Sequence, residues 1–244
     1  MLRRASRPDR LVILGGGYIG LEFASMYAGY GTSVTVLEQR PAVLAHEDPD
    51  VADAALSVLS GRGGATILTG GAEVTEVQTV PRPGTPPLAR VGGYRVGGRA
   101  ATVEADVVLI ALGRTPNSAY LRLDRAGGVE MTDTGAVVVD DYRRSSQPHI
   151  YAVGGDVNGG PQFTYISLDD YRIVLDQLGG AAEPRSAAQR RAVPNCLFLS
   201  PPLARVGLTE SQARTAGYDL KVAASPVVNL ATVARAASSM TRPG

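Results

Sequence analysis

The run LGGGYIG, residues 14–20, constrains the fold of this chain more than any other feature. An apolar, β-branched segment, residues 10–14, precedes it and predicts a buried strand, and apolar side chains at helical spacing follow it. In a strand–turn–helix of this kind Gly15 allows the tight turn, Gly17 lets the backbone approach a pyrophosphate, and Gly20 lets helix and strand pack closely. Because the helix N-terminus offers free N–H groups to phosphates, the run predicts a dinucleotide site.

Strands and helices continue to alternate after this turn. Residues 33–38 predict a second strand, residues 48–63 a second helix and residues 65–68 a third strand. This alternation is typical of the nucleotide-binding half of a doubly wound sheet. Glu38 ends the second strand, where a carboxylate can accept hydrogen bonds from a ribose 2′-hydroxyl.

Glu38 also bears on the choice between NADH and NADPH. A carboxylate facing a 2′-phosphate in a partly desolvated site repels it, which favours NADH. Arg40, two residues further on, has a charge that suits such a phosphate, although a solvated surface charge is the alternative interpretation. NADPH therefore stays open as the second possibility.

The pattern changes in the middle of the chain. Residues 72–80 and 94–105 alternate like antiparallel strands across a Pro/Gly-rich loop at 81–93, and they predict a small meander. Residues 106–113 then predict a further strand of the main sheet. Residues 135–160 contain two more strand candidates.

The last third of the chain starts with a predicted helix at 164–180, closed by paired glycines. A strand at 196–200 and a helix at 209–217 follow it. We expect three domains: a nucleotide-binding domain over 1–116, part of a second domain over 117–190, and the start of a third over 191–244.

Composition excludes several classes of function. The net charge of +1 gives no electrostatic case for nucleic acid or a membrane surface as partner. No apolar run is long enough to span a bilayer, and the basic start MLRRASRPDR lacks the apolar stretch of a signal peptide, so we expect a cytoplasmic protein.

Metal and disulfide chemistry find little support in the sequence. Cys196 is the one cysteine, which we expect to be a buried small hydrophobe rather than a nucleophile, and no Cys/His spacing matches a zinc site. His46 begins the run HEDPD, which we interpret as a helix start with Asp48 as cap and Pro49 in the first turn. We therefore expect no metal ligands.

A second candidate ligand site lies in SSQPHIYAVGGDVNGGPQFTYIS. Here a predicted strand ends in a glycine turn, Asp156 follows, and a helix begins near Thr164. An aspartate at the end of a strand can hydrogen-bond a polyol, and the positive end of a helix can stabilise negative charge on a reduced ring system. On the residues alone, a structural loop remains the alternative.

Four runs, GGGYIGLEFA, VVLIALGRTPN, IYAVGGDV and PPLARVGLTE, occur in the order seen in the pyridine nucleotide-disulfide oxidoreductases. The chain resembles this family from Leu11 to about Arg235, and looks most similar to its RclA-type, reactive-chlorine-resistance branch. The resemblance implies homodimers with FAD, NAD and interface domains. It implies an α/β fold: a Rossmann-like, doubly wound NAD-binding domain with an inserted antiparallel meander, part of an FAD-binding domain and the start of an α+β dimerisation domain.

The resemblance also implies roles for individual residues. Tyr18 would be the mobile ring that covers the flavin until the nicotinamide arrives, although a core aromatic at the helix start is an equal alternative. Glu22 would pair with a lysine beside the flavin, and Asp156 would hold the ribityl chain of the flavin. The backbone at Phe163 and Thr164 would face the pyrimidine end of the ring. The nicotinamide nucleotide would be bound by Gly15, Gly17, Tyr18, Ile19, Gly20 and Glu38, with Gly113 lining the same cleft.

The chain departs from the family pattern in several places. The family begins with an FAD fingerprint and a Cys-x4-Cys redox pair, and its interface domain continues to a His–Glu pair; none of these occurs here. Family members also usually have one glycine before the aspartate, whereas this chain reads Gly154-Gly155-Asp156.

From these departures we expect no catalytic residue in the chain and no turnover by the chain alone. The expected function is that of an FAD-dependent NAD(P)H oxidoreductase that passes electrons to a disulfide, metal or oxidant acceptor. The first alternative is a non-catalytic nucleotide-binding remnant. A single-domain alcohol dehydrogenase is the weaker alternative, because no Tyr/Lys or His group is suitably placed.

Overall fold

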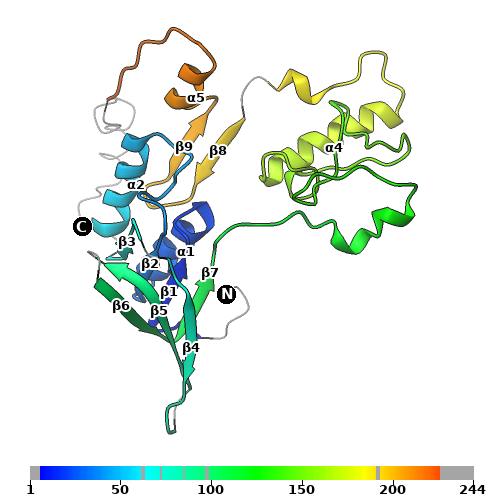
Figure 1. The fold of residues 1–244 in the computed structure, drawn as a ribbon. Coiled ribbons are helices and arrows are strands. Elements are labelled where there is room, and N and C mark those ends of the chain that lie inside the picture. The colour runs from blue at the N-terminus through cyan, green and yellow to red at the C-terminus, as the bar shows by residue number, and fades with distance from the viewer. Residues whose placement is uncertain are drawn as a thin grey trace, which may run out of the picture. The chain divides into compact units, whose positions relative to one another are not determined.

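The structure is a computed structural model that describes residues 6–61, 64–71, 73–84, 86–96, 99–190 and 193–225. It divides into two compact units, Met1–Gly207 and Leu208–Gly244. Figure 1 labels the helices and strands along the chain. The first unit holds every strand of the described residues and all but one of their helices.

Four parallel strands form the main sheet of the first unit. They are β1 (Arg10–Leu14), β2 (Ser33–Leu37), β3 (Thr66–Leu68) and β7 (Val107–Ile110), in the order β3-β2-β1-β7. All four coincide with strands expected from the sequence. This order places β1 in the interior of the sheet, so the turn after β1 lies between the ends of β2 and β7, where doubly wound sheets bind their ligands.

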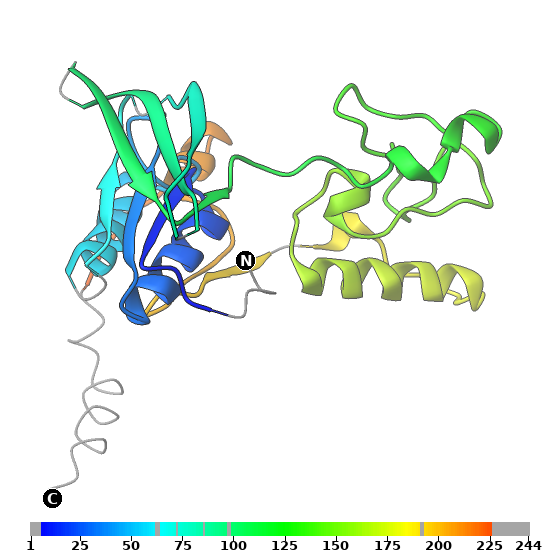
Figure 2. The ribbon, with the colours of Figure 1, turned by 90° about the horizontal axis from the view of Figure 1, so that it is seen from below.

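The side chains of successive β1 residues point to opposite faces of the sheet, and both faces are buried. Leu11 and Ile13 pack in one core with α1 (Tyr18–Gly29) and α2 (Pro49–Gly61), as expected from the sequence. Val12 and Leu14 belong to a second core on the opposite face, together with residues of the antiparallel meander. The parallel sheet therefore lies between a helical layer and a β layer (Figure 2).

The meander has three strands, whereas the sequence predicted two separated by a long loop. The strands are β4 (Glu76–Val80), β5 (Leu88–Val96) and β6 (Arg99–Ala105), paired antiparallel in that order. The expected loop at 81–93 is therefore too long, because its last six residues belong to β5. A bulge at Gly93, whose φ is +80°, permits this, and an added Cβ there would overlap the Thr75 hydroxyl.

The two strand candidates within residues 135–160 are a second correction. This segment makes only two isolated bridges, Met131 with Val137 and Arg144 with Tyr151. Its backbone groups close turns instead: Arg143 has a φ of +66° and accepts the N–H of Ala152 over 3.0 Å. A ladder of consecutive pairs cannot form across such a turn, although a small core around Val129, Val137 and Ala152 still forms.

Two helices surround the second glycine turn. The short α3 (Gly155–Asn158) was not expected, whereas α4 (Thr164–Leu178) begins at the predicted residue. Gly179 caps α4, and Gly180 follows with a φ of +65°, as the paired glycines indicated. Three short 3-10 helices complete this part: Ala119–Leu121, Leu123–Arg125 and Ala187–Gln189.

A two-stranded antiparallel sheet follows, made of β8 (Pro194–Leu197) and β9 (Leu203–Val206). The sequence predicted β8 but not β9. Leu197 and Leu199 pack into the core beneath α1 and α2. Cys196 in β8 is half-buried rather than buried, which corrects the expectation.

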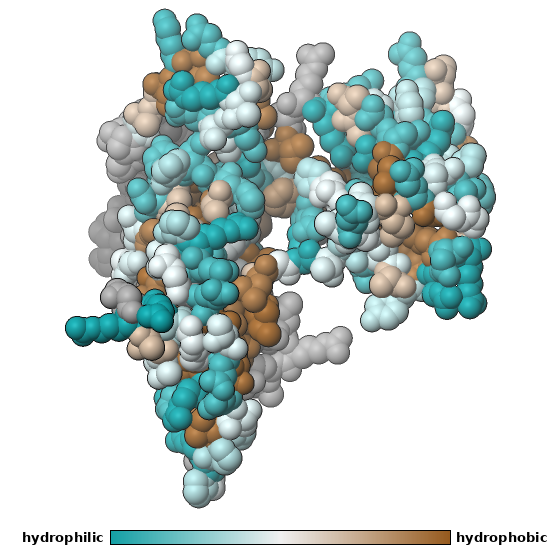
Figure 3. All heavy atoms as spheres, in the orientation of Figure 1, coloured by the Kyte–Doolittle hydropathy of each residue, from teal (hydrophilic) through white to brown (hydrophobic). Residues whose placement is uncertain are grey.

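In the second unit α5 (Glu210–Thr215) carries a capping box, because the side chains of Thr209 and Gln212 bond reciprocally to the backbone. Of the expected third domain, residues 191–192 and 226–244 lie outside the described residues. Hydrophilic and hydrophobic residues are interspersed on the face drawn in Figure 3. Within the described ranges, no helix has the length and apolar character needed to cross a membrane.

Candidate functional site

A cleft of about 540 Å³ opens at the carboxyl ends of β1, β2 and β7. Several residues singled out in the sequence line it: Gly15, Gly17, Glu38, Arg40 and Gly113. They come from three separate strand ends, and the parallel register of these strands brings them to one edge of the sheet. The cleft therefore has the position at which a doubly wound sheet binds a nucleotide.

The fingerprint glycines each meet a different steric demand. Gly15 has a φ of +106°, and an added Cβ would lie 2.5 Å from the carbonyl oxygen of Ala111 at the end of β7. At Gly20 a Cβ would overlap the carbonyl oxygen of Gly15, so this residue sets the close packing of α1 on the turn. At Gly17, the N-cap of α1, an added Cβ would meet no atom within 4 Å, so the backbone there is open. This opening is where a pyrophosphate would approach.

Glu38 is fixed at the edge of the cleft by two backbone hydrogen bonds. Its Oε2 accepts the N–H of Gly16 over 2.6 Å, and its Oε1 accepts the N–H of Arg40 over 2.8 Å. These two bonds hold the side chain of Glu38 beside the glycine turn. The side chain of Arg40 is exposed and lines the same cleft.

Tyr18 is the first residue of α1 and is half-buried. Its hydroxyl donates a hydrogen bond to Oε1 of Glu47, a residue of the loop before α2. The amide of Asn195 in β8 donates to the same hydroxyl over 3.3 Å. Burial, and then the hydrogen bond to Glu47 and its charge, raise the pKa of Tyr18 to about 12, so the phenol stays protonated near neutral pH.

The other predicted residues of this part lie around the same turn. Ile19 is 41% exposed beside it. Gly113 has a φ of +142° and open space around it. Glu22 lies one helical turn after Tyr18, and its carboxylate accepts the backbone N–H of Phe198 over 3.0 Å. Phe198 directly follows β8, so Glu22 ties α1 to that strand.

A second, smaller cavity of about 110 Å³ lies at the start of α4. Asp156, Phe163 and Thr164, the three residues predicted to meet a flavin, all line it, together with Arg114. Asp156 is exposed in the first turn of α3. Its position depends on Gly155, where an added Cβ would overlap the carbonyl oxygen of Gly160.

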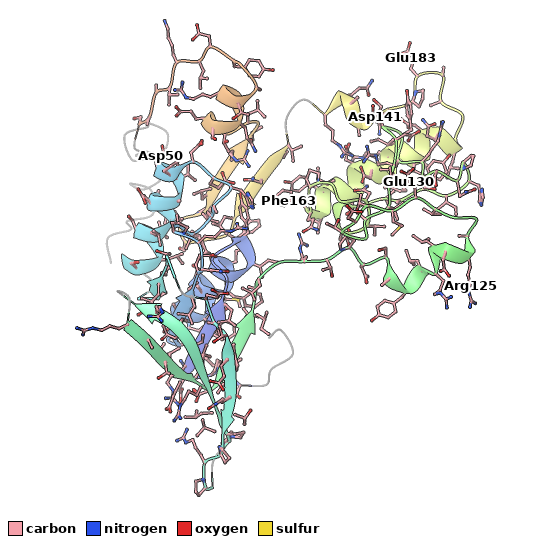
Figure 4. The ribbon with its side chains drawn as sticks, in the orientation of Figure 1. Asp50, Arg125, Glu130, Asp141, Phe163 and Glu183 are labelled. Carbon is pink, nitrogen blue, oxygen red and sulfur yellow. The ribbon has the colours of Figure 1, made fainter. Side chains whose placement is uncertain are left out.

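Two aromatic contacts lie at this cavity. The rings of Phe163, labelled in Figure 4, and Tyr165 stack with centroids 5.2 Å apart. The ring of Tyr18 stands edge-on to Phe163 at 6.5 Å. The structure thus places the predicted residues in two groups, one around the fingerprint turn and one at the start of α4, with Tyr18 and Phe163 in contact between the groups.

Sequence reasoning missed Asp170, which fixes the second glycine turn. Its side chain is fully buried in α4, and its Oδ2 accepts the N–H of Gly154 over 2.9 Å and the amide of Asn158 over 3.0 Å. Its other oxygen pairs with Arg190. The helical spacing of the sequence could have identified this residue, because it puts Asp170 on the same face of α4 as the buried Ile166 and Ile173.

Two family models match the chain. Residues 1–170 match the pyridine nucleotide-disulphide oxidoreductase family, and residues 193–241 match its dimerisation domain. The chain belongs to the pyridine nucleotide-disulphide oxidoreductase family. Its mixed α/β fold, with one parallel sheet and antiparallel additions, is the fold expected from the sequence.

Curated relatives agree with this assignment. The chain is 43% identical over 227 residues to the probable pyridine nucleotide-disulfide oxidoreductase RclA of Escherichia coli (strain K12), which covers 93% of this chain and 48% of RclA. It is 35% identical over 220 residues to mercuric reductase of Staphylococcus aureus, covering 90% of this chain and 38% of that protein. The chain thus spans about half or less of the length of these relatives.

Solved structures give the same result. The HOCl-induced flavoprotein disulfide reductase RclA from Escherichia coli superposes with a TM-score of 0.82 at 40% identity, covering 96% of this chain and 51% of that chain. LpdA from Mycobacterium tuberculosis superposes with a TM-score of 0.77 at 27% identity, covering 98% and 48% respectively.

Proposed function

We propose that this chain supplies the nicotinamide-nucleotide site and part of the flavin site of an FAD-dependent NAD(P)H oxidoreductase. The observation that carries the proposal is the cleft of about 540 Å³ in which the open backbone at Gly17 and the fixed carboxylate of Glu38 meet at one sheet edge. Gly15 and Gly113 line this cleft with φ of +106° and +142°, and Gly20 lets α1 pack closely on the turn.

The proposed nucleotide geometry follows from the cleft. The pyrophosphate takes the N-terminus of α1 at Gly17, where backbone N–H groups and the helix dipole favour negative charge. The adenosine ribose lies at Glu38, whose carboxylate accepts its 2′-hydroxyl. Because this charge would repel a 2′-phosphate, NADH is the preferred nucleotide, although Arg40 provides the one neighbouring cation in the cleft lining.

The proposed flavin contacts lie around the second cavity. Asp156 accepts hydrogen bonds from the ribityl hydroxyls, and the backbone at Phe163 and Thr164 faces the pyrimidine end, where the N-terminus of α4 favours negative charge. FAD bound by these residues would supply a hydride acceptor for the nicotinamide and a carrier of the electrons. Tyr18 covers the approach to the flavin, Ile19 contacts the nicotinamide nucleotide, and Glu22 pairs with a lysine beside the flavin.

Three further statements complete the proposal. The domains run over 1–116 for NAD, 117–190 for part of the FAD site and 191–244 for the start of the dimerisation domain. The full-length protein is a cytoplasmic homodimer, which the dimerisation-domain match supports. Its final electron acceptor is a disulfide, a metal ion or an oxidant, in line with the names of RclA and mercuric reductase.

We further propose that this chain does not reduce such an acceptor by itself. Cys196 is its one cysteine and is half-buried in β8, so the chain cannot form an internal redox disulfide. The second candidate function, a nucleotide-binding remnant without turnover, is favoured by this same observation.

Reconstitution with FAD distinguishes the two candidates. The purified chain is incubated with FAD, passed over a desalting column and mixed anaerobically with NADH while the visible flavin absorbance is followed. Retained flavin that bleaches on mixing supports a hydride-transfer unit. Chain that binds NADH but retains no flavin supports the remnant, and chain that binds neither overturns the proposal.

A further inference from the structure

A group of polar side chains surrounds Tyr18 beside the nucleotide cleft, and apart from Tyr18 its members have no part in the function proposed so far. Tyr18 begins α1, Glu47 lies in the loop between β2 and α2, Asn195 lies in β8 and Arg205 in β9. These four residues, which we call the Tyr18 network, come from four separate elements. They meet around the carboxylate of Glu47.

Glu47 is the centre of the Tyr18 network. Its side chain is 1% exposed. Its Oε1 accepts hydrogen bonds from the hydroxyl of Tyr18 and, over 3.3 Å, from Nη2 of Arg205. The Nε of Arg205 lies 3.0 Å from Oε2 of Glu47, and Asn195 donates to the Tyr18 hydroxyl from the other side. The phenol is therefore held between a buried carboxylate and an amide.

The buried carboxylate of Glu47 has a cation and hydrogen-bond donors around it. A buried carboxylate needs a cation and hydrogen-bond donors, because its desolvation is otherwise too costly. Arg205 neutralises Glu47, and the Tyr18 hydroxyl supplies a further donor. A hydrogen bond to a charged acceptor is about twice as strong as one between neutral groups. The raised pKa of Tyr18 keeps the phenol in its donor form.

The position of Tyr18 links this network to nucleotide binding. Tyr18 directly follows Gly17, the open backbone position of the cleft, and its ring contacts Phe163 of the second cavity. A nicotinamide that passes from the first cavity to the second meets this ring. The ring can turn about its side-chain torsions only if its hydroxyl leaves Glu47.

We propose that Glu47 is a positioning residue that holds Tyr18 in place while the nucleotide is absent. This inference rests on the proposed function, in which Tyr18 is the mobile ring that covers the flavin. Nucleotide binding breaks the bond between the Tyr18 hydroxyl and Glu47. Part of the binding free energy is spent on that step, so the network weakens nucleotide affinity and keeps the ring over the flavin approach. Asn195 and Arg205 connect β8 and β9 to the same network, because they contact Tyr18 and Glu47.

A double-mutant cycle tests the proposal. NADH binding is measured by isothermal titration calorimetry on the unmodified chain, on Tyr18→Phe, on Glu47→Ala and on the double variant. Tyr18→Phe removes only the hydroxyl and leaves the Glu47–Arg205 pair intact. We expect each single variant to bind NADH about tenfold more tightly, as for loss of one hydrogen bond to a charged group. The double variant should gain nothing further.

Asp106→Asn is the matched control, because it alters an Arg–carboxylate pair away from the cleft and should leave the NADH dissociation constant unchanged. Unchanged or weaker binding in Tyr18→Phe overturns the proposal. So does a double variant in which the two gains add, because the effect of Glu47 would then not pass through the hydroxyl.

A second measurement needs no nucleotide and separates failure of this proposal from failure of the proposed function. The chain has ten tyrosines, which are labelled with ¹³C at Cζ, and Tyr18 is assigned by its loss in Tyr18→Phe. We expect the Tyr18 resonance to move toward the free-phenol position in Glu47→Ala and to stay closer to its original position in Glu47→Gln, which retains an acceptor. A Tyr18 resonance that is the same in the original chain and in both Glu47 variants overturns the network. If NADH does not bind, the proposed function fails and this resonance still decides the network.

Discussion

At the scale of single residues, the fingerprint glycines differ in what they contribute. Gly20 is required for packing, since an added Cβ would overlap the Gly15 carbonyl oxygen. Gly20→Ala should therefore lower the free energy of unfolding by about 2 kcal/mol, as overpacking does. Gly29→Ala is the control in the same helix, because its Cβ meets no atom within 4 Å and alanine favours helix. Denaturant unfolding should show a loss for Gly20→Ala and no loss for Gly29→Ala; equal losses contradict the packing role.

Two neighbouring aspartates offer a second test at this scale. Asp170 is fully buried among Gly154, Asn158 and Arg190, whereas Asp169 is 39% exposed and pairs with Arg190. Asp170→Asn leaves Arg190 with its buried partner neutralised and should cost about 3 kcal/mol of unfolding free energy. Asp169→Asn should cost less than about 1 kcal/mol. Thermal and urea unfolding of the two variants measure this difference, and similar costs would show that Asp170 does not fix the glycine turn.

At the scale of elements, β7 is joined to the start of β1 by a charged contact. Asp106 accepts the backbone N–H of Arg10 over 2.8 Å and its guanidinium over 3.2 Å. Burial alone would raise the pKa of Asp106, but the two groups of Arg10 outweigh burial and lower the pKa below 3.8. A lowered pKa in the folded state stabilises the fold above pH 3.8, and this contribution is lost as the pH falls further.

The pH dependence gives the prediction for this contact. Asp106→Asn should reduce the unfolding free energy by about 1 kcal/mol at neutral pH. The difference from the unmodified chain should shrink when unfolding is measured below pH 3.8. A difference that stays constant between neutral and acidic pH would rule out the carboxylate as its source.

The sequence predicted those elements whose patterns are local. The parallel strands and α1, α2 and α4 were identified from apolar periodicity, glycines and caps within one short window each. The strand candidates within residues 135–160 failed because apolar alternation does not report whether a partner strand is adjacent, and here the backbone turns at Arg143. β9 was missed for the same reason: it has four residues, and its pairing with β8 defines it.

Local sequence patterns likewise predicted one part of the candidate site but not the other. Gly15, Gly17 and Glu38 could be predicted because the fingerprint fixes their spacing. The Tyr18 network could not, because Tyr18 and Asn195 are 177 positions apart and only the folded chain brings them within hydrogen-bond distance.

At the scale of the whole molecule, the chain has one cysteine and two cavities, which are lined by residues proposed to meet a nicotinamide nucleotide and a flavin. It spans 48% of RclA and 38% of the mercuric reductase it resembles. In the proposed function, the part of this chain is nucleotide binding and the approach to the flavin. The central claim thus concerns the cleft at the ends of β1, β2 and β7.

Calorimetric titration of the chain with NADH and with NADPH tests this claim most directly, with Glu38→Gln as the variant. We predict one NADH per chain and NADPH binding at least about tenfold weaker, because the fixed carboxylate repels the 2′-phosphate. Glu38→Gln should reduce this preference by strengthening NADPH binding. Equal affinity for the two nucleotides in the original chain, or no binding of NADH at all, would contradict the account.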